Sequence, residues 1–256
     1  MSAVRVAVAG ASGRMGRALL EAASATGGIE LAAALDVTPG KWGAMDVGTD
    51  VAGALRGADV LIDFTRPEGT LAHLRACLEA GRGLVIGTTG FTPAQLDEIR
   101  AAASRIPIVL APNMSVGVNV SLKLVELAAR ALGPDYDVEV FEMHHKLKVD
   151  APSGTALKLG EVAAAARGAT LERDGVFARH GVTGERKAGS IGFSVARGGD
   201  IVGDHTVYFA GPGERIEITH RASSRTTYAQ GAMRAAKFLH GKGPGLYDMR
   251  DVLGLG

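Results

Sequence analysis

Short apolar segments alternate with Ala-, Leu- and Glu-rich segments over the first 112 residues. The apolar segments lie at 4–9, 30–35, 60–64, 84–87 and 106–110. Because each is almost continuously apolar and is followed by a segment of helical composition, the pattern predicts a parallel sheet with helices on both faces. Pro67 and Pro93 predict the first turns of two of these helices. Thr65 and Thr92 are the predicted N-caps.

The second half of the chain begins with a longer helix and then changes its pattern. A helix is predicted at 113–132, where apolar residues recur at roughly the 3.6-residue spacing of an amphipathic helix, namely Val116, Val120, Leu124, Leu127 and Ala131. The segments at 138–143, 190–196, 205–209 and 215–220 alternate apolar and polar residues. This period of two predicts an open sheet, antiparallel or mixed, with one face exposed to solvent. Further helices are predicted at 155–166 and 226–239.

The composition is that of a globular protein without a strong overall charge. Among its 256 residues, 28 Lys and Arg nearly balance 27 Asp and Glu. This balance argues against a nucleic-acid or anionic-membrane partner, so any anion site must be local. The single cysteine, Cys77, excludes an intramolecular disulfide and a cysteine-built zinc site, and we expect it to be a buried apolar residue. Without a signal peptide or an apolar segment of about 18 residues, the expected location is cytoplasmic, with no membrane partner.

A glycine-rich turn follows the first predicted strand and opens a helix. Its residues are Gly10, Ala11, Ser12, Gly13, Arg14, Met15 and Gly16. Glycines allow the backbone to approach a pyrophosphate, and the N–H groups of the helix N-terminus stabilise its charge. Asp36, twenty residues after Gly16 at the end of the second strand, is placed to bind the ribose hydroxyls of a dinucleotide. A plain strand–helix turn would not need this acid, so we predict a nicotinamide dinucleotide site.

Residues near Asp36 bear on the choice between NADH and NADPH. Asp36 repels a 2′-phosphate, and Val37 offers no cation to hold one. Arg14 and Lys41 can offset this in part, unless they are solvated surface charges. We therefore expect NADH as the cofactor, with NADPH tolerated.

Two loops follow the fourth and fifth predicted strands. Ligands bind beyond the carboxyl ends of parallel strands, so both loops are expected to face the nicotinamide half of the cofactor. Taken alone, they would also fit ordinary turns. The residues are Gly87, Thr88 and Thr89 in the first loop and Ala111, Pro112, Asn113 and Met114 in the second.

Cationic side chains gather beside a turn in the sequence EMHHKLKVDAPSGTA at 142–156. His144, His145 and Lys148 can offer a proton donor, a hydrogen-bond donor and a fixed charge. The PSGT sequence at 152–155 then begins a helix, whose N–H groups form a second site for a carboxylate or phosphate. The two features predict a small substrate with two negative groups. A solvated basic surface is the alternative, while metal ligation is disfavoured because lysines lie nearby and the spacing of a zinc-binding helix is missing.

Seven segments, in order along the chain, make it resemble one enzyme family. They are VAGASGRMGR at 8–17, IDFTRPEGTL at 62–71, VIGTTGF at 85–91, APNMSVGVN at 111–119, EMHHKLKVDAPSGTAL at 142–157, GDIVGDHTVYFAGPGERIEITHRASSR at 199–225 and LYDMRDVLGL at 246–255. On these motifs the chain resembles the 4-hydroxy-tetrahydrodipicolinate reductases of diaminopimelate and lysine biosynthesis. The resemblance implies that water is lost from a hydroxylated cyclic imine and that hydride from NADH or NADPH reaches ring carbon C4, which gives tetrahydrodipicolinate.

The resemblance also implies two domains, one that binds the cofactor and one that binds the substrate. A doubly wound parallel Rossmann-type α/β domain, residues 1–114 plus 225–256, would bind the dinucleotide. A smaller α+β domain on an open mixed or antiparallel sheet, residues 115–224, would bind the substrate and form a homotetramer through its sheet.

Residue roles carry over from the same family. The pyrophosphate would lie on 10–15, the ribose on Asp36 and the nicotinamide near the loops at 87–89 and 111–114. His144 would be the acid/base residue and Lys148 the proton donor. One carboxylate of the small dianionic heterocyclic substrate would bind His145 and Lys148. The other would bind Ser153, Gly154 and Thr155.

Two other functions fit parts of the pattern. The first is another small-acid dehydrogenase on the same architecture, such as an amino-acid or semialdehyde enzyme. A semialdehyde dehydrogenase would need a cysteine nucleophile, and Cys77, on a predicted helix of the first domain, is badly placed for that role. A non-catalytic sensor that binds a dinucleotide would not need both the cationic segment at 144–148 and the PSGT turn. The combination therefore favours the reductase.

Overall fold

The computed structural model describes residues 2–256 and contains two compact units, each of which is described by itself. The first consists of the residues up to Val116 together with Arg225–Gly256, and the second is Gly117–Ser224. Within the described residues, no helix is both long enough and apolar enough to cross a membrane.

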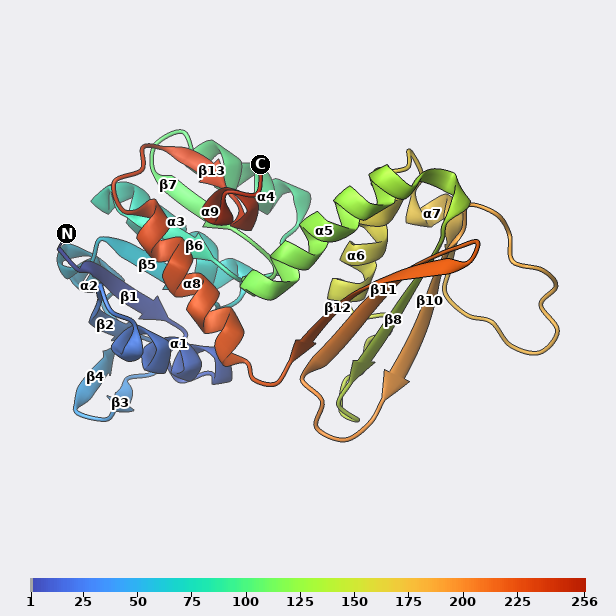
Figure 1. Cartoon of the computed structure of the whole chain (residues 1–256). Coiled ribbons are helices and arrows are strands. Elements are labelled where there is room, and N and C mark those ends of the chain that lie inside the picture. Colours follow the sequence, from blue (N-terminus) through green and yellow to red (C-terminus); the bar gives the residue numbers. More distant parts are fainter. Residues whose placement is uncertain (1) are drawn as a thin grey trace. The chain divides into compact units, whose positions relative to one another are not determined.

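The first unit is built on an eight-stranded sheet (Figure 1). In spatial order its strands are β13 (Gly245–Tyr247), β7 (Pro107–Leu110), β6 (Gly83–Ile86), β5 (Val60–Asp63), β1 (Val4–Ala9), β2 (Ile29–Leu35), β4 (Met45–Gly48) and β3 (Gly40–Trp42). All neighbouring strands are parallel except β3 and β4. The chain passes from β1 to β2 on one side and later to β5 on the other. The carboxyl end of β1 is therefore the point where the strand order reverses, which is where ligands bind in such sheets.

Helices cover both faces of this sheet (Figure 1). They are α1 (Arg14–Ala25), α2 (Val51–Gly57), α3 (Pro67–Ala80), α4 (Pro93–Ala102), α8 (Thr226–Leu239) and α9 (Met249–Leu253). Val6 and Val8 of β1 belong to the core under α1 and α8. Ala7 and Ala9 belong to the core under α2, α3 and α4. Because both faces are buried, the strand sequence is continuously apolar.

The second unit is built on a five-stranded sheet. Its strands, in spatial order, are β12 (Glu214–Ala222), β11 (Gly203–Gly211), β8 (Asp137–His144), β10 (Ile191–Arg197) and β9 (Gly175–Val176). The sheet is mixed, because β10 is parallel to β8 and β9 while β11 is antiparallel to β8 and β12. The helical segments are α5 (Val116–Leu132, within this unit from Gly117), η1 (Gly133–Asp135), α6 (Gly154–Ala165) and α7 (Leu171–Asp174).

One face of this second sheet forms the core of the unit. A Cβ on Gly160 of α6 would lie 2.5 Å from the Phe193 ring, so a glycine is needed where the helix approaches β10. Along β8, alternate residues point into the same core, from Val138 through Glu142 to His144, and all are buried. The polar residues at the end of the strand are therefore placed inside the unit by the same period of two that buries its valine residues.

The two predicted N-caps have different outcomes. Thr92 is confirmed, because its hydroxyl accepts the Gln95 N–H at 3.3 Å and the Gln95 side chain binds back to the Thr92 N–H. Thr65 is wrong as a cap, since Arg66 occupies the N-cap position of α3 without a side-chain cap bond. The Thr65 hydroxyl hydrogen-bonds Asp63 instead.

The apolar stripe predicted for the helix at 113–132 is also partly wrong. The buried residues of α5 include Val118, Val125 and Ala129, whereas Leu124 and Leu127 are 47% and 60% exposed. The spacing of apolar residues predicts an amphipathic helix, but it does not show which of two overlapping rows of apolar residues packs against the rest of the protein.

The short elements β3, β4, β9, β13, α2, α7 and α9 were not predicted either, since none exceeds seven residues and periodicity is weak over such lengths.

We expect Gly231→Ala to destabilise the first unit. A Cβ at position 231 of α8 would lie 1.7 Å from the carbonyl oxygen of Met114, a backbone atom that cannot move without shifting its loop. Overpacking of this kind costs about 2–3 kcal/mol, which corresponds to a Tm lower by about 4–10 °C. Gly57→Ala is the matched control, because a Cβ there would meet nothing within 4 Å. Its Tm should be unchanged or slightly raised, and an unchanged Tm in Gly231→Ala would contradict the close packing of α8.

Candidate active site

The glycine turn lies at the carboxyl end of β1 and leads directly into α1. Gly10 has a φ of 77°, which favours glycine, and Gly13 is the N-cap residue of the helix. A Cβ on Gly16 would lie 2.0 Å from the Gly10 carbonyl oxygen, so the helix can approach the turn only without a side chain there. Gly13 has no side chain to cap the helix. The N-terminus of α1 therefore presents backbone N–H groups to an anion.

Asp36 follows β2 and is held against this turn. Its carboxylate accepts the Ser12 N–H at 2.8 Å and the Val37 N–H at 2.7 Å. Burial raises the pKa of Asp36, but these hydrogen bonds outweigh burial and leave the pKa below its ordinary value. An ionised carboxylate here accepts hydrogen bonds from hydroxyl groups and repels a phosphate. Val37, which is 94% exposed, adds no positive charge.

A cavity of about 400 Å³ opens beside the turn. Lys41 lines it, and its ammonium is paired with Asp46 at 2.7 Å. Arg17, which was not predicted, lines the same cavity, whereas the predicted Arg14, at the first position of α1, does not. The cations that line the cavity are therefore Lys41 and Arg17.

The loops after β6 and β7 lie at the same edge of the sheet. Thr88 is buried, and its hydroxyl lies 3.1 Å from the carboxylate of Asp63 at the end of β5. The second loop is held to the end of β6 by a hydrogen bond from the Ala111 N–H to the Ile86 carbonyl at 3.1 Å. The parallel sheet thus brings the predicted cofactor residues of 10–15, Asp36, 87–89 and 111–114 to one edge.

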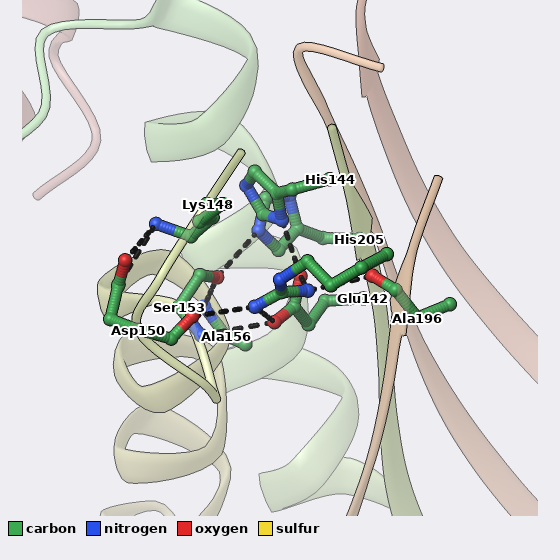
Figure 2. A network of polar contacts seen from close by, with 9 residues as sticks. Glu142, His144, Lys148, Asp150, Ser153, Ala156, Ala196 and His205 are labelled. Atoms are coloured by element: carbon green, nitrogen blue, oxygen red, sulfur yellow. Dashed lines mark hydrogen bonds and ion pairs between the residues drawn. The ribbon is translucent and has the colours of Figure 1, made fainter. Parts of the chain in front are cut away.

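A buried polar cluster forms inside the second unit, where β8, β10, β11 and the start of α6 meet (Figure 2). The two Glu142 oxygens accept the Arg197 guanidinium at 2.9 and 3.0 Å, and one also accepts the Ser153 N–H at 3.1 Å. The other oxygen is bonded to Nδ1 of His144. Burial raises the pKa of Glu142, but Arg197 and His144 outweigh burial and lower it. An ionised Glu142 can only accept, so Nδ1 of His144 carries a proton and Nε2 is left for a ligand.

Opposing influences act on the His144 imidazole. Burial lowers the pKa of His144, Glu142 raises it, and the charges of Lys148 and Arg197 lower it, with a net lowering. The ring is therefore neutral near pH 7. A Cβ on Gly203 would come within 3.0 Å of Nε2, so a glycine keeps this edge of the ring clear. His144 can take and return a proton at Nε2.

His205 of β11 packs edge-on against His144, with ring centroids 5.1 Å apart. Its Nε2 lies 3.1 Å from Oγ of Ser153. Burial, followed by the charge of His144, lowers the pKa of His205 to about 4, so this ring is also neutral. Glu142, His144 and His205 offer atoms within 4.8 Å of one another, the spacing of a metal-ligand set. However, Arg197 occupies the Glu142 oxygens and its charge opposes a cation, so the donor set suits proton transfer better than metal binding.

Lys148 lies in the turn after β8. Its ammonium contacts both oxygens of Asp150 at 2.8 Å, and this bond lowers the pKa of Asp150 (Figure 2). The Asp150 side chain is 57% exposed. Within residues 2–256, Nδ1 of His145 is buried without a hydrogen-bond partner. An orphaned ring nitrogen and an ammonium held by an exposed carboxylate are groups that an incoming carboxylate can recruit.

Ser153 is the N-cap of α6. Its hydroxyl accepts the Ala156 N–H at 3.2 Å, while its own N–H is bonded to Glu142. Gly154 and Thr155 form the first helical positions. A Cβ on Gly154 would meet no atom within 4 Å, so the approach to the helix N-terminus is open to an anion.

Three members of this cluster, Glu142, Arg197 and His205, were not predicted as site residues. Glu142 could have been found, because the period of two places it on the same face as His144. Arg197 and His205 come from later strands, and no local pattern connects them with residues 144–155. Only the strand order brings them to His144.

Comparison with known proteins gives the family. The model described as "Dihydrodipicolinate reductase, N-terminus" matches residues 4–114, and "Dihydrodipicolinate reductase, C-terminus" matches 117–253. The 4-hydroxy-tetrahydrodipicolinate reductase of Thiobacillus denitrificans is 59% identical over 265 residues, which cover 98% of this chain and 99% of that protein. The enzyme of the same name from Nitrosospira multiformis is 58% identical over 267 residues, which cover 100% and 99%.

Solved structures agree with this result. The dipicolinate-bound dihydrodipicolinate reductase from Paenisporosarcina sp. TG-14 has a TM-score of 0.78 at 25% identity, covering 97% of this chain and 98% of that one. A probable dehydrogenase from Thermotoga maritima shares the fold, with a TM-score of 0.64 at 13% identity, covering 98% of this chain and 93% of that one. The predicted fold class and the family resemblance are confirmed. The chain belongs to the dihydrodipicolinate reductase family, the pyridine-nucleotide-dependent reductases of lysine and diaminopimelate biosynthesis.

Proposed function

We propose that this chain reduces 4-hydroxy-tetrahydrodipicolinate to tetrahydrodipicolinate with hydride from a nicotinamide dinucleotide. The observation that carries the proposal is the buried Glu142–His144 pair, which is joined by one hydrogen bond to Ser153 at the start of α6. A proton-transfer group and a helix N-terminus for a carboxylate are thus adjacent. The Paenisporosarcina reductase binds dipicolinate, a heterocycle with two carboxylates, which supports a dianionic heterocyclic substrate here.

The first unit would hold the dinucleotide. Residues 10–15 would receive the pyrophosphate at the N-terminus of α1, Asp36 the ribose, and the loops at 87–89 and 111–114 the nicotinamide. The bound cofactor supplies the hydride. The contribution of the chain is to orient the dinucleotide at the carboxyl edge of the sheet.

The second unit would hold the substrate by its two carboxylates. His145 and Lys148 would bind one, with the substrate carboxylate replacing Asp150 on Lys148. The other would bind at the start of α6, through Ser153, Gly154 and Thr155.

The reaction consumes one hydride and one proton. Elimination breaks the bond from C4 to its hydroxyl and a C–H bond of the neighbouring ring carbon, and the two groups leave as water. Hydride then adds at C4, and the neighbouring ring carbon takes one proton. His144, oriented by Glu142, is the proposed acid/base residue, and Lys148 is the proposed proton donor.

The structure disfavours the rival semialdehyde dehydrogenase. Cys77 is fully buried, and burial followed by the charge of Asp63 raises the pKa of its thiol to about 12. A thiolate nucleophile is therefore not available at this position.

We also propose a cofactor preference, an assembly and a location. Asp36 and the exposed Val37 favour NADH over NADPH, while Lys41 allows some use of NADPH. The outer face of the second-unit sheet, where Phe141 is 37% exposed, would form a homotetramer. The biosynthetic family supports a cytoplasmic location, and the net charge of +1 supports neither a nucleic-acid nor a membrane partner.

The direct test is oxidation of NADH by the purified chain with freshly generated 4-hydroxy-tetrahydrodipicolinate. His144→Gln and Lys148→Ala should each lower kcat by about 100-fold or more, because each removes a proton-transfer group. His180→Gln and Lys158→Ala, which change exposed residues of the same types, are the matched controls and should retain normal turnover. Binding of NADH without its oxidation would favour the non-catalytic sensor over the reductase. Normal turnover in both His144→Gln and Lys148→Ala would contradict the proton-transfer roles proposed for these two residues.

Glu142→Gln should shift the pH dependence of turnover. Loss of the carboxylate removes an interaction that favours the imidazolium, so the pKa of His144 falls further. The limb of the kcat/KM profile that disappears in His144→Gln should move to lower pH. Glu161→Gln, which changes a surface carboxylate on α6, should leave the profile in place. A profile unchanged by Glu142→Gln would mean that Glu142 does not act on His144.

The cofactor preference is tested by kcat/KM with NADH and NADPH. The unmodified chain should use NADH at least as well as NADPH. Val37→Arg should move the ratio towards NADPH by about tenfold, because a guanidinium beside the ribose can hold a 2′-phosphate. Val182→Arg, at a fully exposed position of the second unit, should not change the ratio. A strong NADPH preference in the unmodified chain would contradict the proposal.

A further inference from the structure

The proposed mechanism leaves one fully buried carboxylate of the first unit without a role. Asp63 is the last residue of β5 and has no exposed surface. Strand β5 lies between β1 and β6, so Asp63 at its carboxyl end lies between the glycine turn after β1 and the loop after β6. Burial of a carboxylate is costly unless several donors compensate. Its position at the ligand-binding edge of the sheet therefore needs an explanation.

The donors around Asp63 come from three segments. Oδ1 accepts the Thr65 N–H and hydroxyl at 2.8 and 2.7 Å, and it lies 3.1 Å from the hydroxyls of Thr70 and Thr88. Oδ2 lies 2.5 Å from Nδ1 of His73. Burial raises the pKa of Asp63, but the bonds to His73 and Thr65 outweigh burial and lower it. The carboxylate is thus an ionised centre that joins the turn after β5, helix α3 and the loop after β6.

Thr88 is the connection from this centre to the loop at 87–89. Its side chain is directed inward, since the hydroxyl lies 3.1 Å from Asp63, 2.9 Å from the Thr70 hydroxyl and 3.0 Å from the Thr65 N–H, which it accepts. Thr88 itself is only 5% exposed. Its hydroxyl therefore anchors the backbone of the loop from beneath.

The turn at 63–65 also touches both glycine segments directly. A Cβ on Gly10 would lie 3.1 Å from Cγ2 of Thr65, and a Cβ on Gly87 would lie 2.2 Å from the Phe64 ring. The turn is thus packed between the glycine turn and the loop at 87–89. A displacement of residues 63–65 would move both.

We infer that Asp63 is a positioning residue of the dinucleotide site, which sets the spacing between the glycine turn and the loop at 87–89 through Thr65 and Thr88. The inference rests on the proposed dinucleotide site and adds a residue that does not touch the cofactor. In the proposed site the two segments hold the pyrophosphate and the nicotinamide of one ligand, so an error in their spacing weakens binding of the whole molecule. Misplacement of a bound group by about 1 Å can cost about 100-fold in rate.

A pair of substitutions at Thr88 isolates the hydroxyl. Thr88→Val removes the hydroxyl at nearly constant shape, and Thr88→Ser retains it. The readout is the Kd for NADH, measured by fluorescence titration of the whole chain without substrate. Thr88→Val should weaken binding by about tenfold or more, whereas Thr88→Ser should stay within about threefold of the unmodified chain. Asp63→Asn should weaken binding at least as much as Thr88→Val, because an amide oxygen is a poorer acceptor for this set of donors.

Asp59 provides the matched control at the other end of the same strand. It directly precedes β5, and its carboxylate accepts the Arg5 N–H at 3.0 Å and the Arg5 guanidinium at 2.8 Å. Asp59→Asn makes the same chemical change at the amino edge of the sheet. It should lower Tm while leaving the Kd for NADH unchanged.

Three results would overturn the inference. The first is an unchanged Kd for NADH in Thr88→Val. The second is a loss of NADH affinity in Thr88→Ser as large as that in Thr88→Val. The third is a loss of NADH affinity in Asp59→Asn as large as that in Asp63→Asn. If Asp63→Asn does not fold, the Thr88 pair still decides the question. NADH binding without turnover in the unmodified chain would refute the proposed reaction but leave this comparison valid. An unmodified chain that does not bind NADH would overturn both.

Discussion

The buried negative charge of Glu142 is the constraint on which the site of the second unit depends. Three elements meet on this carboxylate: β8 through His144, β10 through Arg197, and the start of α6 through Ser153. Loss of one partner of such a buried pair typically costs about 3–5 kcal/mol, because the other charge is left without compensation. The orientation of the imidazole and the start of the helix are therefore fixed together. A proton-transfer group and a carboxylate site can keep a constant separation only if they share a rigid support of this kind.

The first unit contains a buried carboxylate, Asp63, whose surroundings resemble those of Glu142. Asp63 and Glu142 are both fully buried near the carboxyl end of a strand, and each carboxylate bonds Nδ1 of a histidine, His73 or His144. Each also accepts a backbone N–H from the turn that precedes a helix, at Thr65 or at Ser153. An apolar residue at either position would pack more easily but could not hold loop N–H groups and hydroxyls in one geometry. In both units the buried charge fixes the geometry of a proposed ligand site.

The sequence predicts the features that depend on neighbours along the chain. The N-cap at Thr92, the glycine turn before α1 and the alternation along β8 are local patterns, and the structure contains all three. Thr65 shows the limit, because a hydroxyl two residues before the helix start fits a cap in the sequence, and only the buried Asp63 in the structure shows what the hydroxyl binds. The same limit applies to α5, whose buried stripe is selected by the helices and strands that it meets. Arg197 and His205 reach His144 only through the order of strands in the sheet, which no local pattern specifies.

The charges around the proposed substrate site fall into two classes that differ in how easily they can rearrange. In the Glu142–Arg197 pair the carboxylate is buried and accepts further bonds, so replacing Arg197 would leave a negative charge without its partner in a low-dielectric interior. The Lys148–Asp150 pair has an exposed carboxylate, and exposed pairs of this kind contribute only about 0–1 kcal/mol. Under the proposed function, a substrate carboxylate would therefore exchange with Asp150 on Lys148 at little cost, since one negative charge replaces another. The proposed site would admit a charged ligand at its solvent-facing pair while the pair that orients His144 stays in place.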